Sequence, residues 1–188
     1  MATMQNTQQK LRDELLVLGC QQGSAEALDQ LVQRWHPRLL RYAQFHVGSP
    51  ETAADLTQET WIAIVRGVGR LADPSAFPAW AYRIVTNKCR DWLRRRRLER
   101  GLFAESVQQA LDHAPSRAAA GSTEAEALEK ALSTLDADDR ILVRLYYFEE
   151  LTVSQVADIF GIPAGTVKSR LHRCRETLRK HLEETNRE

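Results

Sequence analysis

The sequence has few of the residues that cross-link small proteins or bind metals. Its 188 residues include three cysteines, Cys20, Cys89 and Cys174, which lie far apart and form no CxxC or Cys/His cluster. A disulfide framework or a zinc-finger-type site is therefore excluded on sequence grounds. Only nine residues are glycine, and none of them belongs to a Gly-rich phosphate loop. This argues against a P-loop or dinucleotide-binding enzyme.

Long apolar runs and a signal-peptide pattern are also missing. No apolar stretch approaches the roughly 20 residues needed to cross a bilayer. The N-terminus, MATMQNTQQKLRDELL, lacks the basic-then-apolar layout of a signal peptide. With 43% apolar and 27% charged residues, the composition is ordinary for a soluble globular protein. We therefore expect a cytoplasmic protein of one or two domains.

The net charge is only +1, but charge is distributed unevenly along the chain. Residues 83–100 hold eight basic and two acidic side chains, and residues 166–181 hold six basic and one acidic. Residues 101–140, between them, hold three basic and eight acidic side chains. Two basic stripes separated by an acidic segment are typical of polyanion-binding proteins. A solvated helix face gives the same charge run, so each stripe taken alone leaves both interpretations open.

Apolar residues recur with a helical period along nearly the whole chain, without a convincing strand pattern. In the first half we expect helices over about 10–18, 24–47, 50–68 and 75–97. Pro37 should kink or break the second helix. A turn over 72–76 precedes the fourth helix, which Ser75 can cap.

Residues 100–122 mix Pro, Gly, Ser and small side chains, which weaken any period and indicate a linker. Thr123 and Glu126 form a capping box that would begin a second domain. A further helix is expected over about 137–148. The sequence therefore predicts an all-α protein with two small helical domains, 1–99 and 123–188, joined by a flexible linker.

Residues 151–182 carry the pattern of a helix-turn-helix. Thr152 and Gln155 form a capping box, and Gly161 can end the first helix in the left-handed conformation. The second helix, starting near Ala164, has an apolar stripe of Val167, Leu171, Cys174, Leu178 and Leu182. Its opposite face carries Lys168, Ser169, His172, Arg173, Arg179 and Lys180. A basic solvent face is what insertion into the major groove requires, and a generic helical hairpin is the alternative.

One face of the 50–68 helix combines acidic, amide and apolar side chains. Asp55, Gln58, Glu59 and Ile62 follow at i, i+3, i+4 and i+7. This row resembles a partner surface, and an ordinary exposed face is the alternative. The apolar stripe of the same helix consists of Trp61, Ile64, Val65 and Val68. No His or Asp cluster accompanies the paired carboxylates to support acid/base or metal chemistry.

The 75–97 helix has a mixed aromatic, amide and basic face. It consists of Trp80, Arg83, Asn87, Arg90 and Arg94, while Ala81, Ile84, Val85, Cys89 and Trp92 lie toward the core side. Aromatic rings stack on unpaired bases, amides bind base edges and arginines bind phosphates. This face therefore suits single-stranded nucleic acid, and a buried Trp80 is the alternative.

Three segments together resemble the bacterial RNA polymerase sigma factors of the extracytoplasmic-function (ECF) type, within the sigma-70 family. They are DLTQETW at 55–61, FPAWAYRIVTNKCRDWLRRRR at 77–97 and LTVSQVADIFGIPAGTVKSRLHR at 151–173. The third segment alone is shared with other regulators, including LuxR-type ones. The resemblance implies a dissociable, non-enzymatic sigma subunit without a cofactor, which directs core RNA polymerase to specific promoters and helps open the DNA.

The resemblance also implies a role for each surface. Core-polymerase binding is expected at Asp55, Gln58, Glu59 and Ile62. Binding of the single-stranded −10 element is expected at Trp80, Arg83, Asn87, Arg90, Arg94, Arg95, Arg96 and Arg97, with Asn87 holding an extruded base. Recognition of the double-stranded −35 element is expected at Lys168, Ser169, His172 and Arg173. An anti-sigma factor is the further expected partner, with no direct membrane insertion by this chain.

Three other classes of function are alternatives. An autonomous DNA-binding regulator would use the helix-turn-helix, usually as a dimer, but no dimerisation helix with sustained heptads is present. A non-DNA adaptor leaves both basic faces unexplained. An enzyme lacks a nucleophile–base or metal constellation in the sequence. Cys174 lies on an apolar stripe and is expected to be a core residue rather than a redox sensor.

Overall fold

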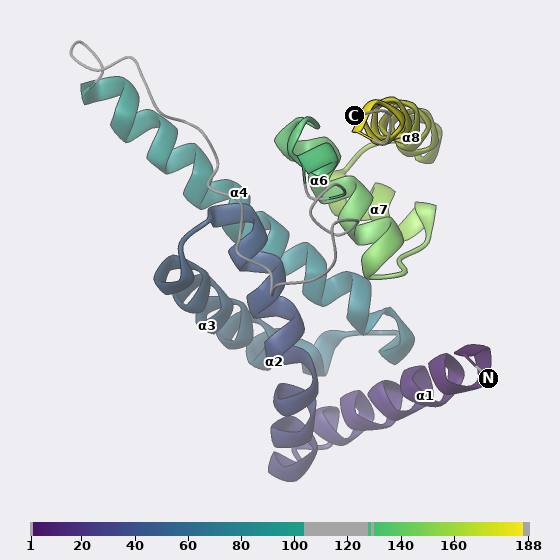
Figure 1. The fold of residues 1–188 in the computed structure, drawn as a ribbon. Coiled ribbons are helices and arrows are strands. Elements are labelled where there is room, and N and C mark those ends of the chain that lie inside the picture. Colours follow the sequence, from purple (N-terminus) through teal and green to yellow (C-terminus); the bar gives the residue numbers. More distant parts are fainter. Residues whose placement is uncertain (1, 104–127, 129, 186–188) are drawn as a thin grey trace. The chain divides into compact units, whose positions relative to one another are not determined.

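The computed structural model describes residues 2–103, 128 and 130–185, and the regular elements among them are all helical (Figure 1). The chain divides into two compact units, Met1–Leu111 and Asp112–Glu188. This confirms the expected all-α fold with two helical units. The capping box expected at Thr123 and Glu126 lies outside the described residues, as does most of the expected linker over 100–122.

The N-terminal unit is built from long helices joined by short connections. They are α1 (Ala2–Gln21), α2 (Ala25–Val47), α3 (Pro50–Gly67), two 3-10 turns, η1 (Val68–Arg70) and η2 (Pro74–Ala76), and α4 (Phe77–Phe103). Helix α1 is longer than the expected 10–18 helix. Helix α4 continues past residue 97 into the segment interpreted as linker. Gly48, at φ 70°, ends α2 in the left-handed conformation.

Pro37 was expected to kink or break the second helix, and no break occurs: α2 runs through Pro37 without interruption. A proline inside a helix removes one backbone N–H and frees the carbonyl of the residue four positions earlier, here Gln33. Both Pro37 and Gln33 are exposed, so water can satisfy the freed carbonyl. Burial of Trp35 and Leu39 on the opposite face then keeps the helix continuous.

The expected cap at Ser75 is also wrong, because the capping residue is Asp73. The Asp73 carboxylate accepts a hydrogen bond from the Ser75 backbone N–H at 2.9 Å and from the Ser75 hydroxyl at 2.7 Å. Ser75 lies inside η2, which leads directly into α4 at Phe77. The Ser75 hydroxyl thus donates to the Asp73 carboxylate in a charge-assisted hydrogen bond, and no backbone N–H in the described part of α4 donates to it.

Aromatic rings fill the centre of the N-terminal unit. Trp35, Tyr42, Phe77 and Tyr82 are each at most 2% exposed. The Trp35 and Phe77 ring centroids lie 5.2 Å apart, edge to face, and those of Tyr42 and Tyr82 lie 5.1 Å apart. The hydroxyls of Tyr42 and Thr86 share a buried hydrogen bond of 2.7 Å. Because these contacts join α2 to α4, they determine which face of α4 points to solvent.

Helix α1 supports the segment between α3 and α4. The Nε of Arg34 donates to Oδ1 of Asp13 at 2.8 Å, which ties α1 to α2. The Gln21 amide donates to the backbone carbonyls of Val68 at 3.1 Å and Leu71 at 2.8 Å. Since both carbonyls precede α4, these bonds help to place the start of that helix.

The described part of the C-terminal unit starts with helical residues at 128 and 130–133. It continues with α6 (Ala137–Val143), a π-helical turn η3 (Arg144–Phe148), α7 (Val153–Phe160) and α8 (Ala164–Thr185). The single helix expected over 137–148 is therefore α6 followed by a wider turn. Phe148, at the end of this segment, is 52% exposed. The π turn changes the register that a regular helix would keep.

The helix-turn-helix is confirmed in detail. The Thr152 hydroxyl accepts from the Gln155 N–H, and the Gln155 side chain accepts from the Thr152 N–H, so both bonds of the capping box are present. Gly161, at φ 66°, ends α7 in the left-handed conformation, and α8 begins at Ala164. Val167, Leu171 and Cys174 are at most 4% exposed. This burial fixes the opposite face of α8 toward solvent.

Candidate nucleic-acid and partner interfaces

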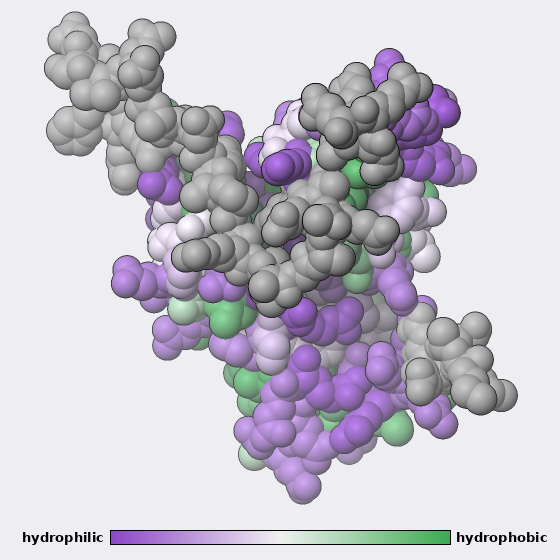
Figure 2. Space-filling view, viewed as in Figure 1, coloured by the Kyte–Doolittle hydropathy of each residue, from purple (hydrophilic) through white to green (hydrophobic). Residues whose placement is uncertain are grey.

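The predicted contact row on α3 lies at the surface. Asp55, Gln58, Glu59 and Ile62 are all exposed, Ile62 to 46%. The other face of α3 is buried, and its Thr57 and Thr60 hydroxyls donate to backbone carbonyls of the preceding turn at 2.7 Å. Helix α3 therefore has one buried face, whose two threonine hydroxyls are satisfied within the helix, and one exposed face. The surface visible in Figure 2 is mostly hydrophilic, with apolar residues in small separate patches.

Val65 was expected to be buried, but it is 50% exposed. It lies one turn beyond Ile62, so the two side chains form an apolar end to the row. The helical period of α3 is compatible with either burial pattern, because Val65 sits at the boundary of the apolar stripe. Burial by neighbouring helices decides such positions, and a single-helix pattern does not contain that information.

Glu59 forms an ion pair that sequence reasoning missed. The Lys88 Nζ lies 2.7 Å from Glu59 Oε2, with side chains 35% and 48% exposed. An exposed pair of this kind contributes only about 0–1 kcal/mol. Glu59 can therefore exchange Lys88 for a charged group on a partner at little cost.

The predicted DNA-binding face of α4 is partly exposed and partly packed. Arg83 and Asn87 are exposed, and Arg90 is half-buried. The Trp80 ring is half-buried against the end of α3, since a Cβ atom on Gly67 would lie 2.8 Å from its Cζ2. Trp80 is therefore neither a core residue nor a free stacking platform: one part of its surface packs and another stays accessible.

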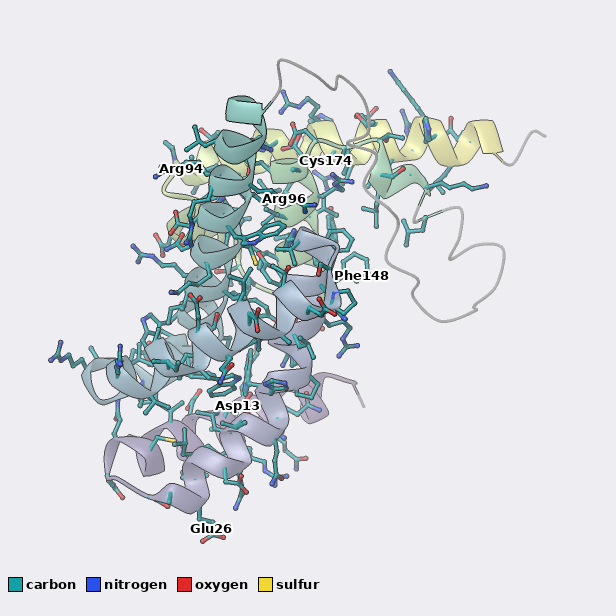
Figure 3. All side chains as sticks on the ribbon, turned by 90° about the vertical axis from the view of Figure 1, so that its left-hand side faces the viewer. Asp13, Glu26, Arg94, Arg96, Phe148 and Cys174 are labelled. Atoms are coloured by element: carbon teal, nitrogen blue, oxygen red, sulfur yellow. The ribbon has the colours of Figure 1, made fainter. Side chains whose placement is uncertain are left out.

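The four consecutive arginines of α4 do not share one surface. Because the helix continues through them, successive side chains point about 100° apart. Arg94, Arg95 and Arg97 are exposed, whereas Arg96 is half-buried with its guanidinium carbon 4.9 Å from the Trp92 ring centroid. Figure 3 shows Arg94 and Arg96 projecting from different sides of α4.

The basic face of α8 is exposed where the sequence predicts it. Lys168, Ser169, His172 and Arg173 all lie at the surface, opposite the buried Val167, Leu171 and Cys174. The Ser169 hydroxyl donates to the Thr166 carbonyl at 3.0 Å, which leaves its lone pairs free to accept.

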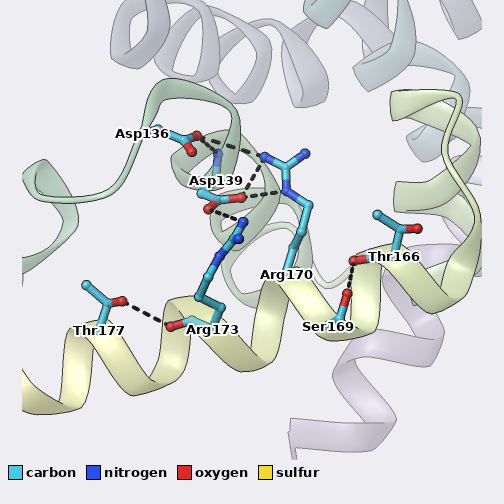
Figure 4. A network of polar contacts seen from close by, with 7 residues as sticks. All are labelled: Asp136, Asp139, Thr166, Ser169, Arg170, Arg173 and Thr177. Atoms are coloured by element: carbon cyan, nitrogen blue, oxygen red, sulfur yellow. Dashed lines mark hydrogen bonds and ion pairs between the residues drawn. The ribbon is translucent and has the colours of Figure 1, made fainter.

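A buried carboxylate under this face was not predicted. Asp139 of α6 is 5% exposed, and its Oδ1 lies 2.6 Å from both Nε and a terminal nitrogen of Arg170 (Figure 4). Its Oδ2 lies 3.4 Å from a terminal nitrogen of Arg173. An acidic residue in the first turn of a helix looks like a dipole-stabilising residue in sequence, and nothing in the pattern identifies a partner 31 positions away.

Burial raises the pKa of the two buried cysteine thiols, Cys89 and Cys174. Burial raises the pKa of Cys89 to about 12. Burial, together with the adjacent Asp139 carboxylate, raises the pKa of Cys174 to about 11. Cys174 is 1% exposed, which confirms the expectation that it is a core residue.

Within the described ranges, no three His, Cys, Asp or Glu side chains gather as a metal site would require. Each described helix is also too short or too polar to span a membrane.

Comparison with known proteins matches both units to one family. Residues 31–99 match the Sigma-70 region 2 model, and residues 131–180 match the Sigma-70 region 4 model. The chain is 31% identical over 187 residues to the RNA polymerase sigma-H factor of Pseudomonas aeruginosa, covering 94% of this chain and 97% of that protein. It is 34% identical over 164 residues to the ECF RNA polymerase sigma factor SigE of Mycolicibacterium smegmatis, covering 86% of this chain and 63% of SigE.

Solved structures of sigma factors share the fold. The sigma factor RpoE of Bartonella quintana, solved in complex with the anti-sigma factor NepR, has a TM-score of 0.67 at 26% identity, covering 82% of this chain and 96% of RpoE. CnrH, solved in complex with the cytosolic domain of CnrY, has a TM-score of 0.65 at 25% identity, covering 92% of this chain and 98% of CnrH. The chain therefore belongs to the ECF sigma factors of the sigma-70 family, which direct RNA polymerase to promoters for transcription initiation.

Proposed function

We propose that the two halves of the chain divide promoter recognition between them. Residues 1–99 bind core polymerase and the opened −10 element, residues 123–188 bind the −35 element, and residues 100–122 connect them. The observation that carries the proposal is that each predicted contact row contains exposed side chains on a helix whose other face is core. Side chains at such positions are free to bind partners without disturbing the fold.

Strand opening is the task we assign to α4. Opening a duplex costs a few kcal/mol for each unstacked step. Capture of an extruded base by Asn87, with stacking on the accessible part of Trp80, offsets part of that cost, since base–aromatic stacking contributes about 1–3 kcal/mol. Arg83, Arg90 and the exposed members of the arginine run bind the backbone, which adds salt-dependent affinity.

Duplex recognition is the task we assign to α8. Lys168, Ser169, His172 and Arg173 project from one exposed face of a helix that the major groove can admit. Each well-formed base contact discriminates by about 1–3 kcal/mol.

The polymerase itself supplies the chemistry, so we propose that this chain catalyses no bond formation and needs no cofactor. We also propose a cytoplasmic location, where polymerase and promoter DNA are found. The solved relatives named above were captured with anti-sigma factors or a cytosolic partner domain. We therefore propose that an anti-sigma factor regulates this chain too, and that any attachment to a membrane runs through that partner.

The polymerase interface is tested with the double variant Asp55→Ala, Gln58→Ala. Loss of two exposed polar contacts is expected to weaken binding to core polymerase by about 10- to 100-fold, measured by titration of labelled protein. The matched control is Asp29→Ala, Gln33→Ala, since α2 carries the same two residue types at its surface, hydrogen-bonded to each other at 2.9 Å. Unchanged binding by the α3 variant, or an equal loss in the α2 control, would contradict the assignment.

A further inference from the structure

A carboxylate on α6 is bonded to two arginines of α8, one half-buried and one exposed. We propose that Asp139 is a positioning residue, which holds the Arg173 guanidinium in the orientation that discriminates base pairs of the −35 element. The inference rests on the proposed role of α8 in reading that element.

The two oxygens of Asp139 have different partners. Oδ1 accepts from Arg170, whose Nε and terminal nitrogen both lie at 2.6 Å. Oδ2 faces Arg173 at 3.4 Å. The Arg170 side chain is 19% exposed, whereas that of Arg173 is 68% exposed. Arg170 is thus a structural partner, and Arg173 is the one that DNA can reach (Figure 4).

The carboxylate is itself fixed in place. The Asp139 backbone N–H donates to Oδ1 of Asp136 at 2.7 Å, which is the N-cap bond of α6. The same Asp136 oxygen lies 3.9 Å from Arg170, so Asp136 and Asp139 both face that guanidinium. These contacts restrain the Asp139 carboxylate toward α8.

The contact between Asp139 and Arg173 orients the Arg173 side chain without occupying all of its hydrogen-bond donors. A separation of 3.4 Å is long for a charge-assisted hydrogen bond, and most of the side chain is exposed. Arginine has five N–H donors, so one contact to Oδ2 leaves several for DNA. Restricting the side chain before binding reduces the entropy lost when it meets a base.

Replacement by asparagine separates the two roles of the carboxylate. In D139N the amide oxygen can still accept from Arg170, while the amide N–H₂ would face Arg173 and repel its donors. The variant also removes one negative charge beneath a basic face, which favours phosphate binding. We expect sequence discrimination to fall while affinity for DNA of unrelated sequence stays equal or rises. General damage to the fold would lower both.

The experiment uses the full chain with core RNA polymerase and a set of promoters with single base-pair changes in the −35 element. Arg173→Ala first identifies the base pair at which discrimination depends on Arg173. We expect D139N to reduce discrimination at that pair by about 3- to 10-fold, a part of the effect of one base contact. Asp158→Asn, which removes an exposed carboxylate on α7, is the matched control.

Combining the substitutions tests whether Asp139 acts through Arg173. In the Arg173→Ala background, D139N is expected to cause no further loss at that base pair. Full discrimination by D139N, or an equal loss at every position, overturns the inference. If Arg173→Ala itself changes no preference, the proposed reading of the −35 element by Arg173 fails instead. Thermal melts check that each variant folds. If D139N does not fold, D139E is the second variant, because it keeps the negative charge for Arg170 but moves the carboxylate by one methylene group away from its position beside Arg173. The same loss of discrimination is expected.

Discussion

Asn87 is the side chain on which strand opening depends most directly in our proposal. It is exposed on α4, one helical turn from Arg83 and Arg90, while the buried Thr86 beside it bonds to Tyr42 in the core. This anchoring fixes the direction in which Asn87 projects. A short amide on a rigid helix can hold a base edge without a large loss of side-chain entropy.

Asn87→Ala is expected to slow strand opening by about 10-fold, because loss of one base contact corresponds to about 1–3 kcal/mol. Permanganate reactivity of unpaired thymines measures opening, and filter binding at low temperature measures the closed complex, which should change little. Gln33→Ala, an exposed amide on α2, serves as the control. Normal opening by the Asn87 variant would remove this residue from the mechanism.

For single residues, the sequence predicts conformation and hydrogen bonding correctly where these depend only on neighbouring residues. The Thr152–Gln155 capping box and the left-handed Gly161 depend only on residues within four positions, and both are confirmed. Trp80 and Val65 depend on helices from elsewhere in the chain, and the sequence pattern did not determine their exposure. The same holds for Asp139, whose partners lie on α8.

Among the elements, the connection between η3 and α7 contains a strained position. Glu150 has φ 54°, in the left-handed region that side chains with a Cβ rarely adopt. The strain allows the chain to leave the π turn and reach the Thr152 cap within a few residues. It places the start of α7, and through α7 the turn that leads to α8.

Glu150→Gly is expected to raise the free energy of unfolding by about 1 kcal/mol, since glycine adopts this conformation without the steric cost. Urea or thermal unfolding monitored by circular dichroism measures the change. The neighbouring Glu149, at φ −101°, gives a matched control, because glycine there relieves no strain, adds entropy to the unfolded chain and should destabilise. Destabilisation by both variants would contradict the assignment of strain.

Helix boundaries were predictable to the extent that capping residues define them. At Pro37 and Ser75 the boundaries expected from the sequence are wrong, and the structure shows the reason. A proline on an exposed helix face is tolerated when burial of the opposite face holds the helix together, and a nearby carboxylate such as Asp73 replaces a hydroxyl as the cap. Both outcomes depend on competition between neighbours rather than on the propensity of one residue.

For the molecule as a whole, sequence resemblance and fold agree on a promoter-specificity subunit. The two basic helices, α4 and α8, belong to different compact units, and each exposes its own polar face. The all-α class and the helix-turn-helix followed from periodicity. The long-range pairs that fix the faces, such as Tyr42–Thr86 and Asp139–Arg170, join positions 44 and 31 residues apart and could not be read from spacing.

Run-off transcription with purified core RNA polymerase on a genomic promoter library tests the central claim most directly. With the chain present, we expect transcripts from a restricted set of promoters that share −10 and −35 elements, and none of these transcripts with core polymerase alone. Specific binding of the isolated chain to duplex DNA, with no promoter-specific transcript when core polymerase is added, would contradict the account and favour an autonomous regulator.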